Sequence, residues 1–248
     1  MIKIERLPAP EELTQEIIAA KTAKFKADPT KPVWKEPYIE SRLMEMSHNK
    51  CCYCECKIGE ESKYMEVEHF HDKGKYPDEV VRWDNLLPSC RSCNGSKHIH
   101  DTIASPIVNP TIDTPSAHLA FKDFRYKAKD HKGEETIAAL NLNDAENKCF
   151  PRFRICNGLN EQIEAIQDKL KDITVGSRTQ DINRLKNKVV RLLQECQCDR
   201  AYTAIKASMV LSNPDFKDIV WKMKDRDWWT PVMEELSEKM HLYAIDLL

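Results

Sequence analysis

The sequence predicts an α+β protein that is mostly helical, with one small irregular region inside it. Residues 63–69 partly alternate between polar and apolar side chains, which is typical of a short strand. Long stretches after residue 115 instead repeat apolar residues at steps of three and four, which is typical of amphipathic helices. Two such stripes are Leu159, Ile163, Ile166, Leu170 and Ile173, and Ile182, Leu185, Val189 and Leu192. We expect these stripes to form a packed helical core.

The remaining elements follow from helix start signals and proline positions. Residues 9–47 are expected to be mainly helical, with a first helix starting near Pro10 and a second over Tyr38–Met46. Residues 94–100 should form a short helix. Prolines at 106, 110 and 115 indicate a linker. The expected organisation is N-terminal helices over residues 1–47, a Cys- and His-rich unit over 48–105, and a C-terminal helical domain over 106–248.

Composition restricts the class of protein. The chain has 248 residues, 41% hydrophobic and 31% charged, and contains no apolar run long enough to cross a membrane and no signal peptide, so we expect a cytoplasmic protein. The net charge of −2 argues against a simple DNA-coating protein. Residues 178–206 carry seven Lys and Arg against three acids, whereas residues 215–248 carry five against eight. These segments could be a nucleic-acid face and a protein-docking face, or solvated helix surface.

Paired cysteines provide the strongest motif in the chain. Cys51 and Cys54 form one C-x-x-C turn, and Cys90 and Cys93 form another. In a reducing compartment two such turns favour a metal over disulfides, and four thiolates form a closed tetrahedral zinc site. Neighbouring Cys52 and Cys56 are alternative ligands, but the matched spacing favours the first set. The other cysteines are expected to be buried free thiols: Cys149, Cys156, Cys196 and Cys198.

The residues between the two C-x-x-C turns indicate hydrolytic chemistry. Hydrolysis of a phosphodiester needs a base to activate water and a cation to stabilise the developing charge. His69 is suited to the first task near pH 7, and the adjacent Glu68 could hold the cation. Asn94 and His98 are four residues apart on the expected helix, so they could bind the same Mg²⁺ or Mn²⁺.

The order of these motifs over residues 50–100 resembles the HNH endonuclease family with structural zinc. The resemblance implies that His69 is the general base, that Glu68 binds the catalytic metal, and that Asn85 orders the loop that orients the base. It also implies that Asn94, and in some members His98, are metal ligands. The acid is Glu instead of the commoner Asp, and the usual Pro-x-x-x-Gly-Gly segment is replaced by residues 71–74, so the metal geometry could differ.

A second resemblance covers most of residues 1–170. The Cys-Cys-Tyr-Cys-Glu turn, Val-Glu-His-Phe at 67–70 and residues 136–143 look like the PtuB-type HNH nucleases of Septu and retron-associated anti-phage systems. This resemblance implies a defence effector partnered by an ABC/SMC-like ATPase, PtuA, and in retron-linked systems by a reverse transcriptase and its RNA–DNA product. DNA is the favoured substrate, although RNA is an alternative.

Two questions stay open at the level of sequence. A non-catalytic zinc module that binds nucleic acid or a protein would also carry both C-x-x-C turns, and only the acid-His and Asn pattern separates it from a nuclease. The adjacent Trp228 and Trp229 suggest that the C-terminal domain docks onto a larger protein, because tryptophan is enriched at buried interfaces. The alternative is that both tryptophans close the core of the helical domain.

Overall fold

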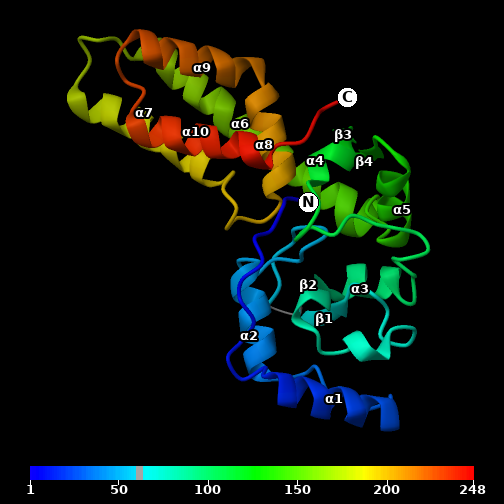
Figure 1. The fold of residues 1–248 in the computed structure, drawn as a ribbon. Coiled ribbons are helices and arrows are strands. Elements are labelled where there is room, and N and C mark those ends of the chain that lie inside the picture. The colour runs from blue at the N-terminus through cyan, green and yellow to red at the C-terminus, as the bar shows by residue number, and fades with distance from the viewer. Residues whose placement is uncertain (60–63) are drawn as a thin grey trace. The chain divides into compact units, whose positions relative to one another are not determined.

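The computed structural model describes residues 1–59 and 64–248, and the chain divides into two compact units (Figure 1). The first unit contains Met1–Leu119 and Tyr126–Asn143, and the second contains Ala120–Arg125 and Asp144–Leu248. Over the described residues the chain is mostly helical, as the sequence predicts, with two small two-stranded sheets. Among the helices described, none is both long and apolar enough to span a bilayer.

The first unit is built around a short antiparallel sheet. Strands β1 and β2 pair so that His69 lies opposite Leu86 and Met65 opposite Cys90. The chain passes from Cys90 at the end of β2 directly into α3, so this strand and this helix are joined without an intervening loop. The elements of this unit are α1 (Gln15–Ala27), α2 (Pro37–Met46), β1 (Met65–His69), η1 (Pro77–Glu79), η2 (Trp83–Asn85), β2 (Leu86–Cys90), α3 (Arg91–Lys97), α4 (Pro115–His118) and α5 (His131–Ala139).

Several element boundaries differ from the sequence-based expectation. Helix α1 starts at Gln15 instead of near Pro10, because Thr14 caps it by accepting a hydrogen bond from the Ile17 amide at 3.3 Å. Helix α2 confirms the second predicted helix and extends it by one residue. Helix α3 starts three residues earlier than expected and ends at Lys97, because His98 has a positive φ of 46°. The predicted strand is confirmed over Met65–His69, while its first residue, Lys63, lies outside the described residues.

The proline-rich stretch after residue 105 is packed and is not an open linker. Ile107 and Val108 are buried, the Val108 amide donates to Thr136 Oγ1 at 2.8 Å, and Pro110 accepts a hydrogen bond from Ile4. The predicted limit between residues 105 and 106 therefore falls inside the first unit. A hairpin that the sequence did not predict, β3 (Leu119–Lys122) and β4 (Arg125–Ala128), carries the chain from one unit to the other and back.

The second unit is a helical bundle with an apolar centre. Helix α6 packs against α7, α8 and α9, and α10 packs against α7 and α8. Both predicted apolar stripes lie in this bundle, on α6 and α7, and their residues are buried in one cluster or packed against it, which confirms them as core. The elements are the π-helix η3 (Ala145–Cys149), α6 (Phe150–Asp172), α7 (Thr179–Gln194), α8 (Thr203–Ser212), α9 (Pro214–Asp225) and α10 (Pro231–Tyr243).

The tryptophan pair closes the core of this bundle. Trp228 is 6% exposed and belongs to the apolar cluster, and Trp229 packs against the same cluster. This packing agrees with the alternative that the pair closes the core of the helical domain, and docking of that domain onto a larger protein stays a prediction. Trp221, on α9, is 65% exposed. As expected, Cys149, Cys156 and Cys196 are buried, and Cys198 is half-buried.

Candidate metal centre and catalytic pocket

Four cysteines from two separate segments meet in the interior of the first unit. The Sγ atoms of Cys51, Cys54, Cys90 and Cys93 all lie within 4.8 Å of one another, and all four residues are buried. Four buried thiols at this spacing form the donor set of a closed tetrahedral zinc site, so the predicted ligand set is the one that the fold brings together. Cys52 and Cys56 are buried as well but lie outside this group.

Backbone hydrogen bonds place the two cysteine turns against each other. The Cys51 amide donates to the Cys56 carbonyl at 2.9 Å and closes the first turn. The Cys52 amide donates to the carbonyl of Pro88 at 2.9 Å, which fixes that turn to β2. Because β2 ends at Cys90 and α3 carries Cys93, the same strand positions the second turn. A metal bound here would join the first cysteine turn to the β2–α3 junction.

A pocket of about 330 Å³ opens beside β1 and α3. It brings together four of the five predicted catalytic residues, Glu68, His69, Asn94 and His98, whereas Asn85 does not line it. Glu68 and His69 are neighbours on β1, yet both reach this space. The other lining residues are Trp34, Lys35, Glu40, Met65, Glu66, Val67, Asp72 and Lys73. Carboxylate, amide, imidazole and ammonium groups therefore face one another in a single pocket.

His69 is held in one orientation and is uncharged near neutral pH. Its Nε2 lies 2.9 Å from the carbonyl oxygen of Val80, which can only accept, so Nε2 carries the proton and Nδ1 keeps a free lone pair. The edge of the ring meets Trp34, with the ring centroids 4.7 Å apart. Burial, with a further contribution from the positive charge of Lys73, lowers the pKa of His69 to about 3. The ring is therefore neutral with Nδ1 unprotonated, and it is a weaker base than an ordinary imidazole, because a general base works best with a pKa near the operating pH.

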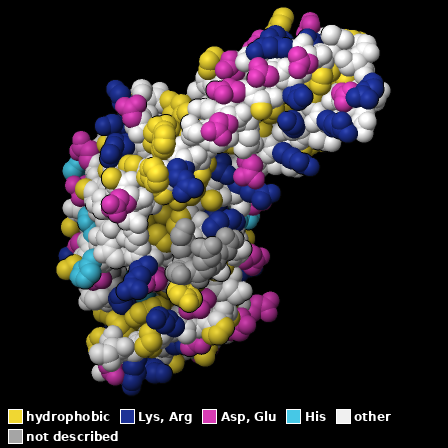
Figure 2. Space-filling view, turned by 180° about the vertical axis from the view of Figure 1, so that it is seen from behind, with side chains coloured by type: hydrophobic (Ala, Val, Ile, Leu, Met, Phe, Trp, Pro, Cys, Tyr) yellow, Lys and Arg dark blue, Asp and Glu magenta, His cyan; other side chains and the backbone are white. Residues whose placement is uncertain are grey.

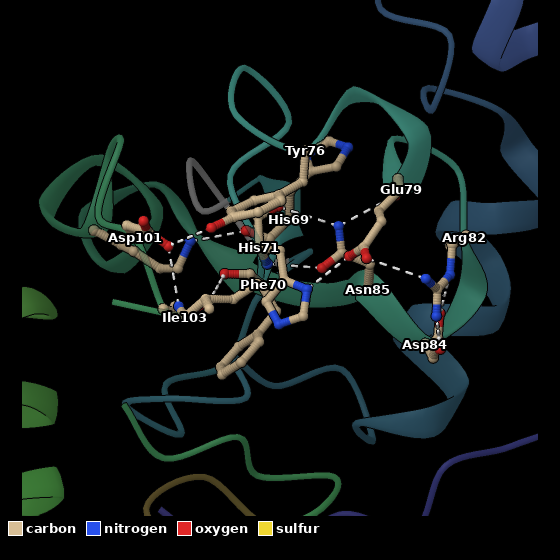
Figure 3. A network of polar contacts seen from close by, with 12 residues as sticks. His69, Phe70, His71, Tyr76, Glu79, Arg82, Asp84, Asn85, Asp101 and Ile103 are labelled. Carbon is tan, nitrogen blue, oxygen red and sulfur yellow. Dashed lines mark hydrogen bonds and ion pairs between the residues drawn. The ribbon is translucent and has the colours of Figure 1, made fainter. Parts of the chain in front are cut away.

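Asn85 fastens the backbone around this histidine (Figure 3). Its Oδ1 accepts a hydrogen bond from the His71 amide at 2.7 Å, and its Nδ2 donates to the carbonyls of His71 and Glu79, each at 3.1 Å. These bonds join the segment after β1 to the η1 segment that ends beside Val80, the acceptor of His69. His71 adds a contact of its own, because its Nδ1 lies 2.6 Å from Glu79 Oε2. Asn85 therefore positions the loop that holds His69.

Glu68 is buried in an ion pair with Lys97, a partner that the sequence analysis did not assign to it. Glu68 Oε1 lies 2.7 Å from Lys97 Nζ, and both side chains are almost fully buried. The same ammonium donates to the carbonyl of His69 at 2.8 Å, so Lys97 ties α3 to the end of β1. Burial raises the pKa of Glu68 to about 7, while the charge of Lys97 acts in the opposite direction.

Of the remaining predicted ligands, Asn94 lies in the middle of α3 and His98 lies at its C-cap. Asn94 Nδ2 donates to Glu66 Oε2 at 2.6 Å. His98 is exposed and lies at the C-cap with φ 46°, so the expectation that it shares a helix face with Asn94 is wrong, although both line the pocket. Glu66 and Asp72 also line the pocket, although they were not among the predicted site residues. The position of Glu66, two residues before Glu68 on the same strand, could have indicated it, because alternate residues share one side.

Comparison with known proteins identifies relatives over most of the chain. The Septu protein PtuB of Bacillus thuringiensis is 41% identical over 220 residues, which cover 87% of this chain and 84% of the relative. The Septu protein PtuB of Bacillus mycoides is 28% identical over 233 residues, covering 76% of this chain and 78% of that protein. No model of a known protein family matches the sequence.

Proposed function

We propose that this chain, which belongs to the family of the Septu protein PtuB, is an HNH-type endonuclease that hydrolyses phosphodiester bonds in nucleic acid. The observation that carries the proposal is the pocket in which Glu68, His69, Asn94 and His98 converge. His69 contributes the expected base, because its Nδ1 is unprotonated and its ring is held by Val80 and Trp34. The buried cysteine cluster fits a structural zinc that would hold this pocket together.

The proposed reaction begins with a water molecule in the pocket next to His69. Nδ1 takes a proton from this water while the oxygen of the water forms a bond to phosphorus. The bond from phosphorus to the leaving oxygen then breaks. Asn85 contributes by holding the Val80 and Glu79 segment, so that the imidazole keeps its proton on Nε2. Lys73 lies 5.1 Å from the centre of the Trp34 ring and lines the pocket, where its charge can attract a phosphate.

A divalent cation such as Mg²⁺ or Mn²⁺, when bound, would neutralise charge on the phosphate and the leaving oxygen. The chain offers oxygen and imidazole donors of the right kind for such a cation on Glu66, Glu68, Asn94 and His98. Glu68 could take part only if its ion pair with Lys97 loosens, whereas Glu66 is half-exposed and already contacts Asn94. Glu66 is therefore the carboxylate that we add to the predicted ligand set.

Cleavage of a supercoiled plasmid in Mg²⁺ or Mn²⁺, with the cation concentration varied, tests this assignment. Glu66→Ala, Asn94→Ala and His98→Ala should each raise the cation concentration needed for half-maximal cleavage. Glu45→Ala is the matched control, because Glu45 is an exposed acid on α2 that does not line the pocket. If all three pocket variants titrate like the control, the cation site is misplaced. If wild-type protein cleaves neither DNA nor RNA, the nuclease proposal fails.

The biological role that we propose is that of an effector in anti-phage defence. Membership of the Septu PtuB family supports this role and a partnership with an ABC/SMC-like ATPase, PtuA. Co-expression of the chain with an ATPase of the PtuA type, followed by size-exclusion chromatography, tests the partnership. Elution as one complex is the expected result, and independent elution of the two proteins at micromolar concentration would contradict it.

One observation favours a second candidate, a zinc module that binds nucleic acid or protein without cleaving it. The Glu68 carboxylate is already neutralised by Lys97, and a ligand engaged in this way binds a cation less readily. The two candidates differ in a simple measurement. A nuclease loses cleavage on His69→Ala while keeping its zinc, whereas the binding module shows no metal-dependent cleavage in the wild type.

A further inference from the structure

Helix α7 of the second unit separates its residues sharply into a buried and a polar side. Leu185, Val189, Leu192 and Leu193 are buried in the apolar cluster of the bundle. The opposite side is formed by Asn183, Arg184, Asn187, Lys188 and Arg191, all of them exposed, and we call these five residues the α7 outer face. The core requires only the first side, so packing does not explain the composition of the second.

The α7 outer face combines positive charge with amide groups and contains no acid. The acidic residue of this helix, Asp181, lies in the first turn and pairs with Arg178 at 2.8 Å and with Arg184 at 3.5 Å. In the part of the chain that the structure describes, Lys188 and Arg191 form no ion pair. In Figure 2, Lys and Arg side chains gather along the outer edge of the second unit, where Figure 1 places α7. The local charge balance therefore favours an anionic partner.

A hollow of about 480 Å³ adjoins this face where α6 ends and α7 begins. Lys169 of α6 and Arg184 and Lys188 of α7 line it together, with Asp172 and Asp181 also present. Exposed ion pairs one helical turn apart contribute little to stability, so a phosphate could replace Asp181 as a partner of Arg184 at little cost. The hollow brings three cations from two helices within reach of one anionic ligand.

The spacing of the cations matches a polyanion with a regular repeat. Arg184, Lys188 and Arg191 lie on one side of a helix, and seven residues of helix extend about 10.5 Å. Phosphates along one strand of a duplex advance about 3.4 Å per nucleotide, so this helix spans about three of them. Asn183 and Asn187 lie between the cations and offer donors and acceptors for sugar, phosphate or base edges.

We infer that the α7 outer face binds the phosphate backbone of nucleic acid and holds the substrate of this protein from the second unit. The inference rests on the proposed nuclease function for the identity of the ligand, and it adds a contact surface that lies in a different unit from the pocket. The cations give affinity without sequence preference, because phosphate contacts position a protein on nucleic acid and do not select bases. The experiment also tests the alternative, in which an acidic protein binds this face.

The experiment measures binding of a fluorescein-labelled 20-base-pair duplex to the full-length protein by anisotropy, in buffer without Mg²⁺ or Mn²⁺. The variant is Arg184→Gln/Lys188→Gln/Arg191→Gln. The matched control, Lys217→Gln/Lys222→Gln/Lys239→Gln, removes the same charge from α9 and α10. We expect the α7 variant to bind at least 10-fold more weakly at low salt. The slope of log K against log salt should fall by about 2 to 3, since each lost phosphate contact removes about 0.9. The control should change affinity by less than twofold.

Three outcomes would overturn the inference. Equal losses of affinity in both variants would indicate a non-specific charge effect. The second outcome is no loss in the α7 variant, and the third is unchanged DNA binding with loss of ATPase co-elution, which assigns the face to a protein. Because binding is measured without a catalytic cation, it is independent of cleavage. If the wild-type protein never cleaves but the α7 variant binds DNA more weakly than the wild type, only the nuclease proposal is contradicted. If the wild-type protein cleaves and the α7 variant binds DNA as tightly as the wild type, only the α7 assignment is contradicted.

Discussion

The two units of this protein are held together in different ways. In the first unit, the segment from Cys51 to Lys97 buries charged and polar groups, and each has a specific partner, such as Lys97 for Glu68 and Val80 for His69. In the second unit, long helices bury a continuous apolar cluster. Apolar packing tolerates small changes, whereas a buried polar network becomes costly as soon as one member is lost. Loss of one polar partner in the site region should therefore cost more than a small apolar change in the cluster of the bundle.

Loss of zinc should have the largest effect and should remain confined to the first unit. Cys90→Ser removes one of four thiols, and structural zinc contributes on the order of 10 kcal/mol to folding. We expect the variant to lose stoichiometric zinc by elemental analysis. Hydrogen exchange should show loss of protection in β1, β2 and α3, while α6–α10 stay protected.

Cys156→Ser is the matched control for this change, since Cys156 is a buried thiol in the second unit, far along the chain from the cysteine turns. It should keep its zinc and the protection of β1 and β2. A Cys90→Ser protein with a full complement of zinc and native exchange rates would show that the cysteine cluster is not the metal centre.

Removal of the ammonium that pairs with Glu68 in the first unit should have the next largest effect. Lys97→Met leaves the Glu68 carboxylate buried without its partner, which costs about 3–5 kcal/mol in comparable cases. Lys206 of the second unit provides the comparison, because its partner Glu195 is 45% exposed and can be solvated. Lys206→Met should cost clearly less in urea unfolding. Equal costs would mean that the burial of the Glu68–Lys97 pair does not set its contribution.

Truncation within the helical core should have an effect of similar or smaller size but should leave the site intact. Ile163→Ala creates a cavity among α6 and its neighbours and should cost about 2–5 kcal/mol in free energy of unfolding. Zinc content and metal-dependent cleavage should stay at wild-type values at 25 °C. Substantial loss of zinc in this variant would show that the first unit depends on the packing of the second.

The sequence predicted those features that depend on local pattern. The helical stripes, the cysteine ligand set and the strand ending at His69 needed only spacing and residue type. Features set by distant contacts were missed. The capping of α1 by Thr14 overrode the proline signal at residue 10, and the packing of Val108 against Thr136 turned an expected linker into core.

For the site, the hardest features to predict were contacts between residues that lie far apart in the sequence. The Glu68–Lys97 pair joins residues 29 positions apart, and no sequence motif indicates it. Residue type was also a poor guide for Trp228 and Trp229. It suggested a docking surface, whereas both tryptophans pack in or against the apolar cluster of the bundle. Pattern identified which residues bear chemistry, and tertiary contacts decided how each one is used.

The central claim, that His69 is the base of a metal-dependent nuclease, is tested most directly by cleavage rates of His69→Ala and His71→Ala in Mn²⁺. His71 is the matched control, since it is two residues away, contacts Glu79 and does not line the pocket. We expect His69→Ala to cleave at least about a hundredfold more slowly than wild type, as removal of a general base does, with unchanged zinc content. His71→Ala should stay within about tenfold of wild type. Near wild-type cleavage by His69→Ala, with His71→Ala inactive, would contradict the account and move the base to the neighbouring histidine.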